Sequence, residues 1–280
     1  MKILRVFPRR TSHTPNDVLV FIGDPPLDRP EADEVHISCT FTWDKLKTER
    51  LKLAWGQYYS VVKVGGPAYD DPGNGFIPGM YLKEGITTTS RGCNNQCPWC
   101  LVPKREGKIR ELQVQPGNII QDNNLLQCSK THIDKVLDML TAQSDIAFSG
   151  GLDARLLTAW IADRIRNLKV RRVFLACDTE EAIKPLRKAL KLLQIPAHHH
   201  KVRCYVLLKF EPDETILHAL IRLLQVYEAG CIPSAQLYQP PDRFIEYPPE
   251  WKRFARLWER PAACYGYVTR LLKQIQGTGV

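Results

Sequence analysis

The sequence predicts an α/β protein whose strands run parallel. From residue 85 onward, short runs rich in β-formers alternate with segments whose apolar residues recur about every 3.6 positions. Before residue 85 the β-rich runs are shorter, turn residues separate them, and one helical segment interrupts them. Alternating β/α units build parallel strands joined by right-handed crossovers. We therefore expect a repeated β/α region preceded by a small α/β unit.

Residues 1–84 are predicted to form that small α/β unit. Strands are expected at residues 2–7, 18–22, 35–40 and 59–64, each bounded by Pro, Gly or Asp. A helix is expected over residues 44–55, with its apolar stripe made of Leu46, Leu51, Leu53 and Trp55. Residues 69–79 are rich in turn residues and are expected to be a loop that leads to the next region.

Residues 85–240 are predicted to form the repeated region. The expected strands are residues 85–90, 118–121, 146–149, 172–177, 203–209 and 234–238, and the expected helices are residues 130–142, 154–167, 180–193 and 214–229. Six strands are two short of a closed eight-stranded barrel. The periodicity therefore predicts six parallel strands, which are too few to close such a barrel.

Residues 241–280 are predicted to form a helical cap on the repeated region. Aromatic and aliphatic residues recur at helical spacing on both sides of Pro261. Because proline interrupts a helix, we expect two amphipathic helices that are broken there.

Composition and charge narrow the class of protein. The chain has 280 residues, of which 44% are hydrophobic, and it carries a net charge of +9. That charge is compatible with a polyanionic partner, but the basic residues alternate with acids at helical spacings, which favours an ordinary basic surface. No apolar run approaches the ~18 residues that a membrane span needs. The apolar stretch at the start of the sequence is too short for a signal peptide, and nine cysteines, an odd number, argue against a disulfide framework and for a reducing compartment. We therefore expect a cytoplasmic protein without a membrane anchor.

Three cysteines, Cys93, Cys97 and Cys100, lie in a C-x3-C-x2-C loop directly after the first strand of the repeated region. A 4Fe-4S cluster normally takes four thiolates, so a loop with three leaves one iron open to another ligand. A zinc site completed by Cys128 or His132 is an alternative, as are ordinary core cysteines. The polar neighbours and the single C-x2-C pair favour the iron-sulfur interpretation.

With Trp99 just before its third cysteine, this loop resembles the cluster loop of the radical S-adenosylmethionine (radical SAM) superfamily. The resemblance implies a 4Fe-4S cluster on Cys93, Cys97 and Cys100, whose open iron binds S-adenosylmethionine. It implies that the reduced cluster cleaves this cofactor to a 5'-deoxyadenosyl radical. It also implies an incomplete (β/α)6 TIM-like barrel and a low-potential electron donor of the flavodoxin or ferredoxin type.

The resemblance also implies which residues bind the cofactor. They are Trp99, Gly150, Gly151, Asp178 and Lys209. The Gly150-Gly151 pair resembles the family's GGE motif, although Leu152 stands where glutamate is common. Asp178 follows the fourth strand and either binds ribose hydroxyls or caps a helix N-terminus. Lys209 follows the fifth strand and either contacts cofactor or substrate, or is solvated.

Charged residues near the loop form a second group of candidates. Asp122 ends the second strand, where it either faces substrate or makes an Asx turn. Arg91, Lys104 and Arg105 flank the cysteines and either tune the cluster's charge, receive an electron donor or are solvated. The residues that act in catalysis beyond cofactor binding are not identified by the sequence, and Tyr238, Cys231 and Cys264 are candidate hydrogen donors to a substrate radical.

The first unit resembles the Rossmann-like leader of cobalamin-dependent radical SAM proteins. It lacks the D-x-H-x-x-G signature that supplies the cobalt ligand, and no G-x-G-x-x-G follows its first strand. We therefore expect a degenerate, cobalamin-binding-like region without cofactor, with a structural or substrate-covering role.

The sequence thus predicts a radical SAM enzyme that abstracts hydrogen from a substrate. The short chain leaves no room for a second cysteine-rich domain, which favours a nucleotide, RNA or small-molecule substrate over a peptide. A non-catalytic binding protein stabilised by zinc or an iron-sulfur cluster is the alternative. An electron-transfer ferredoxin is disfavoured because the loop has no fourth cysteine.

Overall fold

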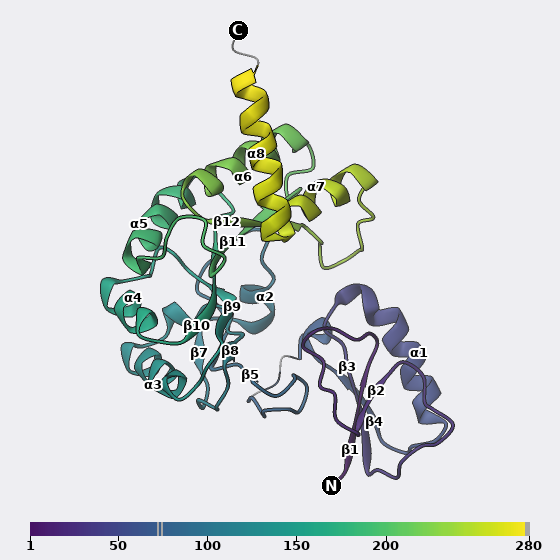
Figure 1. Ribbon diagram of the computed structural model, residues 1–280. Helices are drawn as coiled ribbons and strands as arrows, with labels where there is room; N and C mark the ends of the chain where they lie inside the picture. The colour runs from purple at the N-terminus through teal and green to yellow at the C-terminus, as the bar shows by residue number, and fades with distance from the viewer. Residues whose placement is uncertain (72, 74, 278–280) are drawn as a thin grey trace. The chain divides into compact units, whose positions relative to one another are not determined.

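The computed structural model describes residues 1–71, 73 and 75–277 (Figure 1). Pro72 and Asn74, in the predicted loop 69–79, lie outside the described residues. The chain divides into two compact units, one of residues 1–123 with 240–244 and one of residues 124–239 with 245–280. Both units contain parallel strands joined through helices, so the predicted α/β class is confirmed.

The first unit contains a parallel sheet in the strand order β2-β1-β3-β4. Its strands are β1 (Ile3–Phe7), β2 (Val20–Ile22), β3 (Glu34–Ser38) and β4 (Val62–Gly65), and helix α1 (Lys45–Gly56) connects the last two. All pairings are parallel, with Val6 of β1 opposite Phe21 on one side and Ile37 on the other. The four strands and the helix predicted for this region are confirmed.

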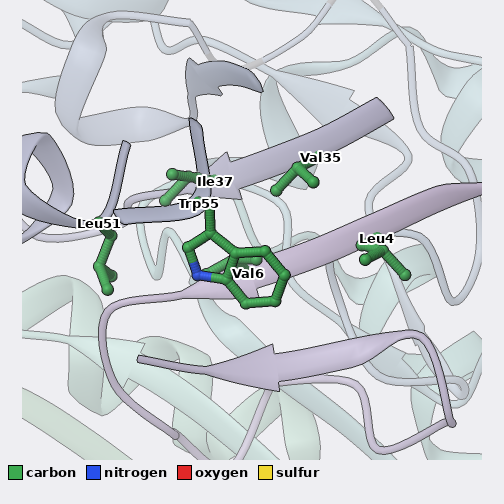
Figure 2. Packing of buried hydrophobic residues seen from close by; sticks show 6 residues of the cluster. All are labelled: Leu4, Val6, Val35, Ile37, Leu51 and Trp55. Carbon is green, nitrogen blue, oxygen red and sulfur yellow. The ribbon is translucent and has the colours of Figure 1, made fainter. Parts of the chain in front are cut away.

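One apolar cluster holds α1 on this sheet. Figure 2 shows its members, each at most 1% exposed: Leu4, Val6, Val35, Ile37, Leu51 and Trp55. Leu51 and Trp55 lie four residues apart and therefore share one helix face. Leu46 and Leu53 are 88% and 74% exposed, so the predicted four-residue stripe is wrong. These two leucines lie seven residues apart on another, exposed face of α1.

The rest of the first unit is built from very short strands. β5 (Ile86–Thr87) pairs in parallel with β8 (Ile119–Ile120), and β6 (Ser90–Arg91) pairs antiparallel with β7 (Arg110–Glu111). The single strand predicted over residues 85–90 is therefore wrong. It divides because Thr89 and Ser90 hydrogen-bond to the side chain of Asp122. Neither β7 nor the short helix α2 (Val102–Glu106) was expected from the sequence.

The second unit contains a parallel sheet segment in the order β12-β11-β10-β9. The strands are β9 (Ile146–Leu152), β10 (Val170–Ala176), β11 (Val202–Leu208) and β12 (Ile232–Leu237). The helices α3 (Lys130–Thr141), α4 (Ala159–Arg166), α5 (Ile183–Leu193) and α6 (Ile216–Glu228) lie on the same side of these strands (Figure 1). The predicted alternation of strands and helices in this region is confirmed.

Hydroxyl side chains set where three of these helices begin. Ser129, Thr158 and Thr215 each accept a hydrogen bond from the backbone N–H three residues later, which satisfies a donor that the helix leaves unpaired. Because Thr158 is the cap, α4 begins at Ala159 and the predicted start at residue 154 is wrong. Residues Glu180–Ala182 form a 3-10 turn ahead of α5, within the helix predicted from residue 180.

The last segment forms helices α7 (Pro249–Glu259) and α8 (Pro261–Gly277), so the predicted break at Pro261 is confirmed. α7 packs against β12, and Trp251, Phe254 and Trp258 are buried. Within the described part of the chain, no helix combines the length and the apolar character needed to cross a bilayer.

Candidate functional site: the cysteine loop and its polar surroundings

The cysteine loop connects β6 to α2 within the first unit, and backbone contacts hold its start in place. The N–H of Cys93 donates to the carbonyl oxygen of Gly107 at 3.0 Å. The Asn94 side-chain oxygen accepts from the N–H of Ile109 at 3.1 Å, and Asn123 Oδ1 accepts from the N–H of Gly92 at 3.1 Å. These bonds join the loop to the segment after α2 and to Asn123, three residues after β8.

Gly92 is the one position of the loop that only glycine fits. Its φ angle is +82°, and a Cβ placed on it would lie 2.2 Å from the carbonyl oxygen of Lys108. A side chain would therefore meet both backbone strain and a direct clash with main-chain atoms. The close approach of Gly92 to the backbone of Lys108 therefore fixes the path of the chain between the end of β6 and Cys93.

Cys97 and Cys100 lie at the two ends of one turn. The N–H of Cys100 donates to the carbonyl oxygen of Cys97 at 3.0 Å, with Pro98 in the second position of the turn, where proline is favoured. The sulfur of Cys93 accepts a hydrogen bond from the N–H of Asn95 at 3.4 Å, and such bonds stabilise negative charge on sulfur. Cys93 is buried, whereas Cys97, Trp99 and Cys100 are half-buried.

The residues of the loop fit an iron-sulfur cluster in donor chemistry. From Gly92 to Leu101 the loop contains three thiols and no carboxylate or histidine, so sulfur is its only strong metal-binding group. Over the described residues, no group of three or more Cys, His, Asp or Glu side chains is assembled into a metal site. The three thiols are carried on one loop whose backbone is anchored. Cys128 and His132, the zinc ligands considered above, are buried in the second unit.

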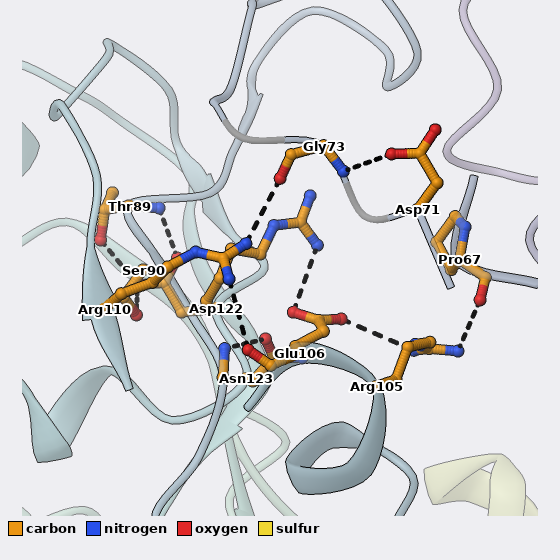
Figure 3. Close-up of polar contacts among 12 residues, drawn as sticks. Pro67, Asp71, Gly73, Thr89, Ser90, Arg105, Glu106, Arg110, Asp122 and Asn123 are labelled. Carbon is orange, nitrogen blue, oxygen red and sulfur yellow. Dashed lines mark hydrogen bonds and ion pairs between the residues drawn. The ribbon is translucent and has the colours of Figure 1, made fainter. Parts of the chain in front are cut away.

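Asp122 anchors the strand that leads into the loop (Figure 3). It is 2% exposed and accepts hydrogen bonds from Thr89 N and Thr89 Oγ1, both at 2.6 Å, and from Ser90 Oγ at 2.7 Å. Burial raises the pKa of Asp122, and these hydrogen bonds oppose the shift because they stabilise the charged form. The Asx turn considered for this residue is not what forms. Its side chain instead joins β5–β6 to the end of β8.

A second buried carboxylate, Glu106 at the end of α2, lies between two arginines. Its oxygens are 3.9 Å from Arg91 NH1 and 3.6 Å from Arg105 NH2 (Figure 3). Burial lowers the pKa of Arg91, and the charges of Glu106 and Asp122 oppose that shift. Arg105 also donates to the carbonyl oxygen of Pro67 at 3.1 Å. Arg91 and Arg105 are therefore held within the first unit instead of being freely solvated.

Gly150 and Gly151 lie inside β9, which continues past residue 149, where the predicted strand ends. The pairing of β9 with β10 shifts register there, with Phe148 opposite Val173 and Leu152 opposite Leu175. The extra residues form a bulge, which Gly151 accommodates with a φ angle of +89°. Both glycines are half-buried in the second unit, and their role toward S-adenosylmethionine stays a prediction.

Asp178 and Lys209 also lie in the second unit, after β10 and β11. Asp178 Oδ1 accepts from the N–H of Leu207 at 2.8 Å, while Thr179 holds the cap position, so the predicted helix cap is wrong. Burial raises the pKa of Asp178, and Arg222 opposes this shift. Lys209 is half-buried, and its Nζ donates to the carbonyl oxygens of Pro212 and Glu214 in its own loop.

Sequence reasoning missed Glu106 and the partners of Asp122. A usable signal for Asp122 was the run from Thr87 to Ser90, whose four hydroxyl side chains are all buried and need polar partners. Glu106 lies in a short charged segment that reads as solvated, and no local pattern marks it. No family model matches this sequence, and no curated protein is significantly similar to it.

Proposed function

We propose that this protein is a radical SAM enzyme whose 4Fe-4S cluster is held by Cys93, Cys97 and Cys100. The observation that carries the proposal is the anchored C-x3-C-x2-C loop, which offers three thiols and no competing ligand type. The hydrogen bond from Asn95 to the Cys93 sulfur supports it, because cluster thiolates are stabilised by such donors.

The cluster would supply reductive cleavage of S-adenosylmethionine, which yields the radical that abstracts hydrogen from a substrate. The residues of this chain have simpler tasks. Gly92 and Asn94 hold the loop backbone, and Pro98 shapes the turn that carries two of the thiols. Trp99, Gly150, Gly151, Asp178 and Lys209 are the proposed contacts to S-adenosylmethionine.

The proposal includes a setting for this chemistry. The parallel β/α repeats would belong to an incomplete (β/α)6 TIM-like barrel, whose strand ends carry the cofactor residues. A low-potential donor of the flavodoxin or ferredoxin type would reduce the cluster in the cytoplasm. A nucleotide, RNA or small molecule would be the substrate.

The test is to purify the full chain without oxygen, reconstitute it with iron and sulfide, and measure both elements per chain. We expect about four of each, the number in one cuboid cluster. Mixing the reconstituted protein with S-adenosylmethionine and a strong reductant should yield 5'-deoxyadenosine. Colourless protein with one zinc and no 5'-deoxyadenosine would support the metal-stabilised binding protein instead.

Cysteine substitutions give a matched comparison. Cys97→Ala should lose the iron and the 5'-deoxyadenosine product. Cys204→Ala, which removes a fully buried thiol of β11, should keep both. Circular dichroism should be used to check that each variant is folded. Unchanged iron content in Cys97→Ala would refute the assignment of the ligands.

A further inference from the structure

The first unit contains a cavity that the proposed cluster chemistry does not use. Its volume is about 660 Å³, within the usual range for small-molecule sites. The cavity lies at the carboxyl ends of β1, β3 and β4, where Phe7, Ser38 and Gly65 contribute to its lining. Segments on either side of the cysteine loop complete the lining through Arg91 and Arg105.

The strand order places this cavity at the position where parallel sheets bind ligands. In the order β2-β1-β3-β4, the chain leaves β1 toward one side for β2 and then returns to the other side for β3. The connections after β1 and β3 therefore diverge, and the gap between them is a topological switch point. Arg9, which follows β1, and Phe41, which follows β3, both line the cavity.

The positive charge of the cavity lining is concentrated at Arg91 and Arg105. The described lining residues include four cationic side chains, Arg9, Lys63, Arg91 and Arg105, and three carboxylates, Asp44, Asp71 and Glu106. Arg9 is fully engaged by Asp44 and Lys63 by Glu34. Arg91 and Arg105 share the single carboxylate of Glu106, so these three side chains together carry one net positive charge, whereas Asp71 elsewhere in the lining carries a negative one. Their side chains are 17% and 18% exposed, so the charge is mostly shielded from solvent.

Several buried polar atoms of Arg91, Arg105, Glu106 and Gln121 lack hydrogen bonds within the described part of the chain. The buried Nε atoms of Arg91 and Arg105, the Oε2 atom of Glu106 and the Oε1 atom of Gln121 have no hydrogen-bond partner among the residues that the structure describes. Buried polar networks that serve structure alone are normally satisfied, because an unpaired buried group is costly. Guanidinium groups that line a cavity offer a planar, charged set of N–H donors, which suits a phosphate oxyanion.

The cavity is much larger than a phosphate ion and has aromatic walls. Phe7, Phe41, Phe76 and Tyr81 contribute to its lining. Aromatic faces bind the flat face of a nucleobase by stacking, and they do so for any base. A nucleoside monophosphate combines the anion, the aromatic ring and the hydroxyl and amino donors that this lining accommodates.

We propose that the first unit binds a nucleoside monophosphate in this cavity, with the phosphate at Arg91 and Arg105 and the base against the aromatic wall. Glu106 limits the affinity for the mononucleotide, because its carboxylate neutralises part of the positive charge that the phosphate would meet. The proposal does not rest on the cluster, since neither the sheet nor the arginines need iron.

The test is titration calorimetry on the full chain with AMP, GMP, CMP and UMP, and separately with the four nucleosides and inorganic phosphate. We expect at least one mononucleotide to bind at least about tenfold more tightly than its nucleoside, because charge-assisted hydrogen bonds to the phosphate are lost in the nucleoside. The same mononucleotide should bind at least about tenfold more tightly than inorganic phosphate, which lacks the stacking base. Absence of binding by all four mononucleotides, or equal binding of inorganic phosphate, would overturn the proposal.

Two substitutions should shift the affinity in opposite directions. Arg105→Gln should weaken mononucleotide binding at least about tenfold, since it removes a charged donor. Glu106→Gln should strengthen it, because both guanidinium groups then lack their carboxylate. Arg105→Lys keeps the charge without the fork, so it should bind with intermediate affinity. Arg50→Gln, an exposed arginine of the same unit, is the matched control and should bind like the original protein.

Thermal unfolding with and without the mononucleotide identifies variants that fold. If Arg105→Gln does not fold, Arg105→Lys should still weaken mononucleotide binding and Glu106→Gln should still strengthen it. Equal affinity in all of these variants would contradict the placement of the phosphate. Cys97→Ala should retain full binding, so a failed cluster and a failed nucleotide site give different results. Loss of binding in Cys97→Ala would show that the site depends on the cluster and would overturn the proposal as stated.

Discussion

The leader sheet and the cysteine-loop region belong to the same unit but are stabilised by different interactions. In the sheet β1–β4, six apolar side chains pack between the strands and α1. Around the loop, from β5 to β8, the buried residues include Thr87, Ser90, Glu106 and Asp122. The sheet is thus held by removal of apolar surface from water, and the loop region by buried hydrogen bonds and charge.

The difference teaches which properties each region can have. Apolar burial is non-directional and largely independent of pH, so the sheet provides a stable platform. Buried polar groups are costly unless paired, but they define directions and charges. The region that carries the thiols and two arginines is therefore the one suited to bind ligands, and its stability should depend on pH.

The largest effect should come from the apolar core of the sheet. Trp55→Ala removes a fully buried side chain whose Nε1 also donates to the carbonyl oxygen of Gly23 at 3.0 Å. We expect a loss of about 3–5 kcal/mol in the free energy of unfolding, because a large cavity replaces the indole. Urea unfolding followed by circular dichroism measures it.

The exposed leucine of the same helix provides the control. Leu53→Ala changes a side chain that is 74% exposed and should alter the free energy of unfolding by less than about 0.5 kcal/mol. Similar losses in Trp55→Ala and Leu53→Ala would mean that α1 does not pack on the sheet through the Trp55 face.

The same contrast explains how far the sequence predicts the fold. The strands β1–β4 and the repeats of the second unit were recognised because their apolar residues follow the period of the element and their ends carry turn or capping residues. The errors arise where two structures share one local pattern. Leu46 and Leu53 have helical spacing to each other but lie on the exposed face of α1, and Gly150-Gly151 suits a turn as well as a bulge.

The thiols and some charged residues of the candidate site were named from the sequence, but the partners of those charged residues were not. The spacing of the thiols is a local property, so Cys93, Cys97 and Cys100 could be found by reading along the chain. Asp122 binds Thr89, 33 residues before it, and Glu106 lies between arginines on two different elements. Such pairings depend on how the strands are brought together, and no periodicity in the sequence records them.

The second-largest loss in the free energy of unfolding should come from the buried polar residues around the cysteine loop. Asp122→Ala leaves three donors from Thr89 and Ser90 without this buried acceptor. We expect a loss of about 1–3 kcal/mol, smaller than for Trp55→Ala because removing the carboxylate also removes its desolvation cost. Urea unfolding at pH 7 measures it, with Asp24→Ala as an exposed control in the same unit. A loss no larger than that of Asp24→Ala would remove the contrast between the two regions.

The smallest effect should be the pH dependence contributed by Asp122. Burial raises its pKa in the folded protein above the value of about 3.9 in the unfolded chain, so the folded state binds the proton more tightly. The stability contributed by this group therefore rises as pH falls through the folded pKa, and the gain is complete below about 3.9. Asp122→Asn cannot titrate and keeps a similar shape. The difference in unfolding free energy between the original protein and Asp122→Asn should thus shift in favour of the original protein from pH 7 to pH 4, as measured by urea unfolding at several pH values. A constant difference would mean that the hydrogen bonds from Thr89 and Ser90 fully offset burial, and a shift toward the variant would mean that they outweigh it.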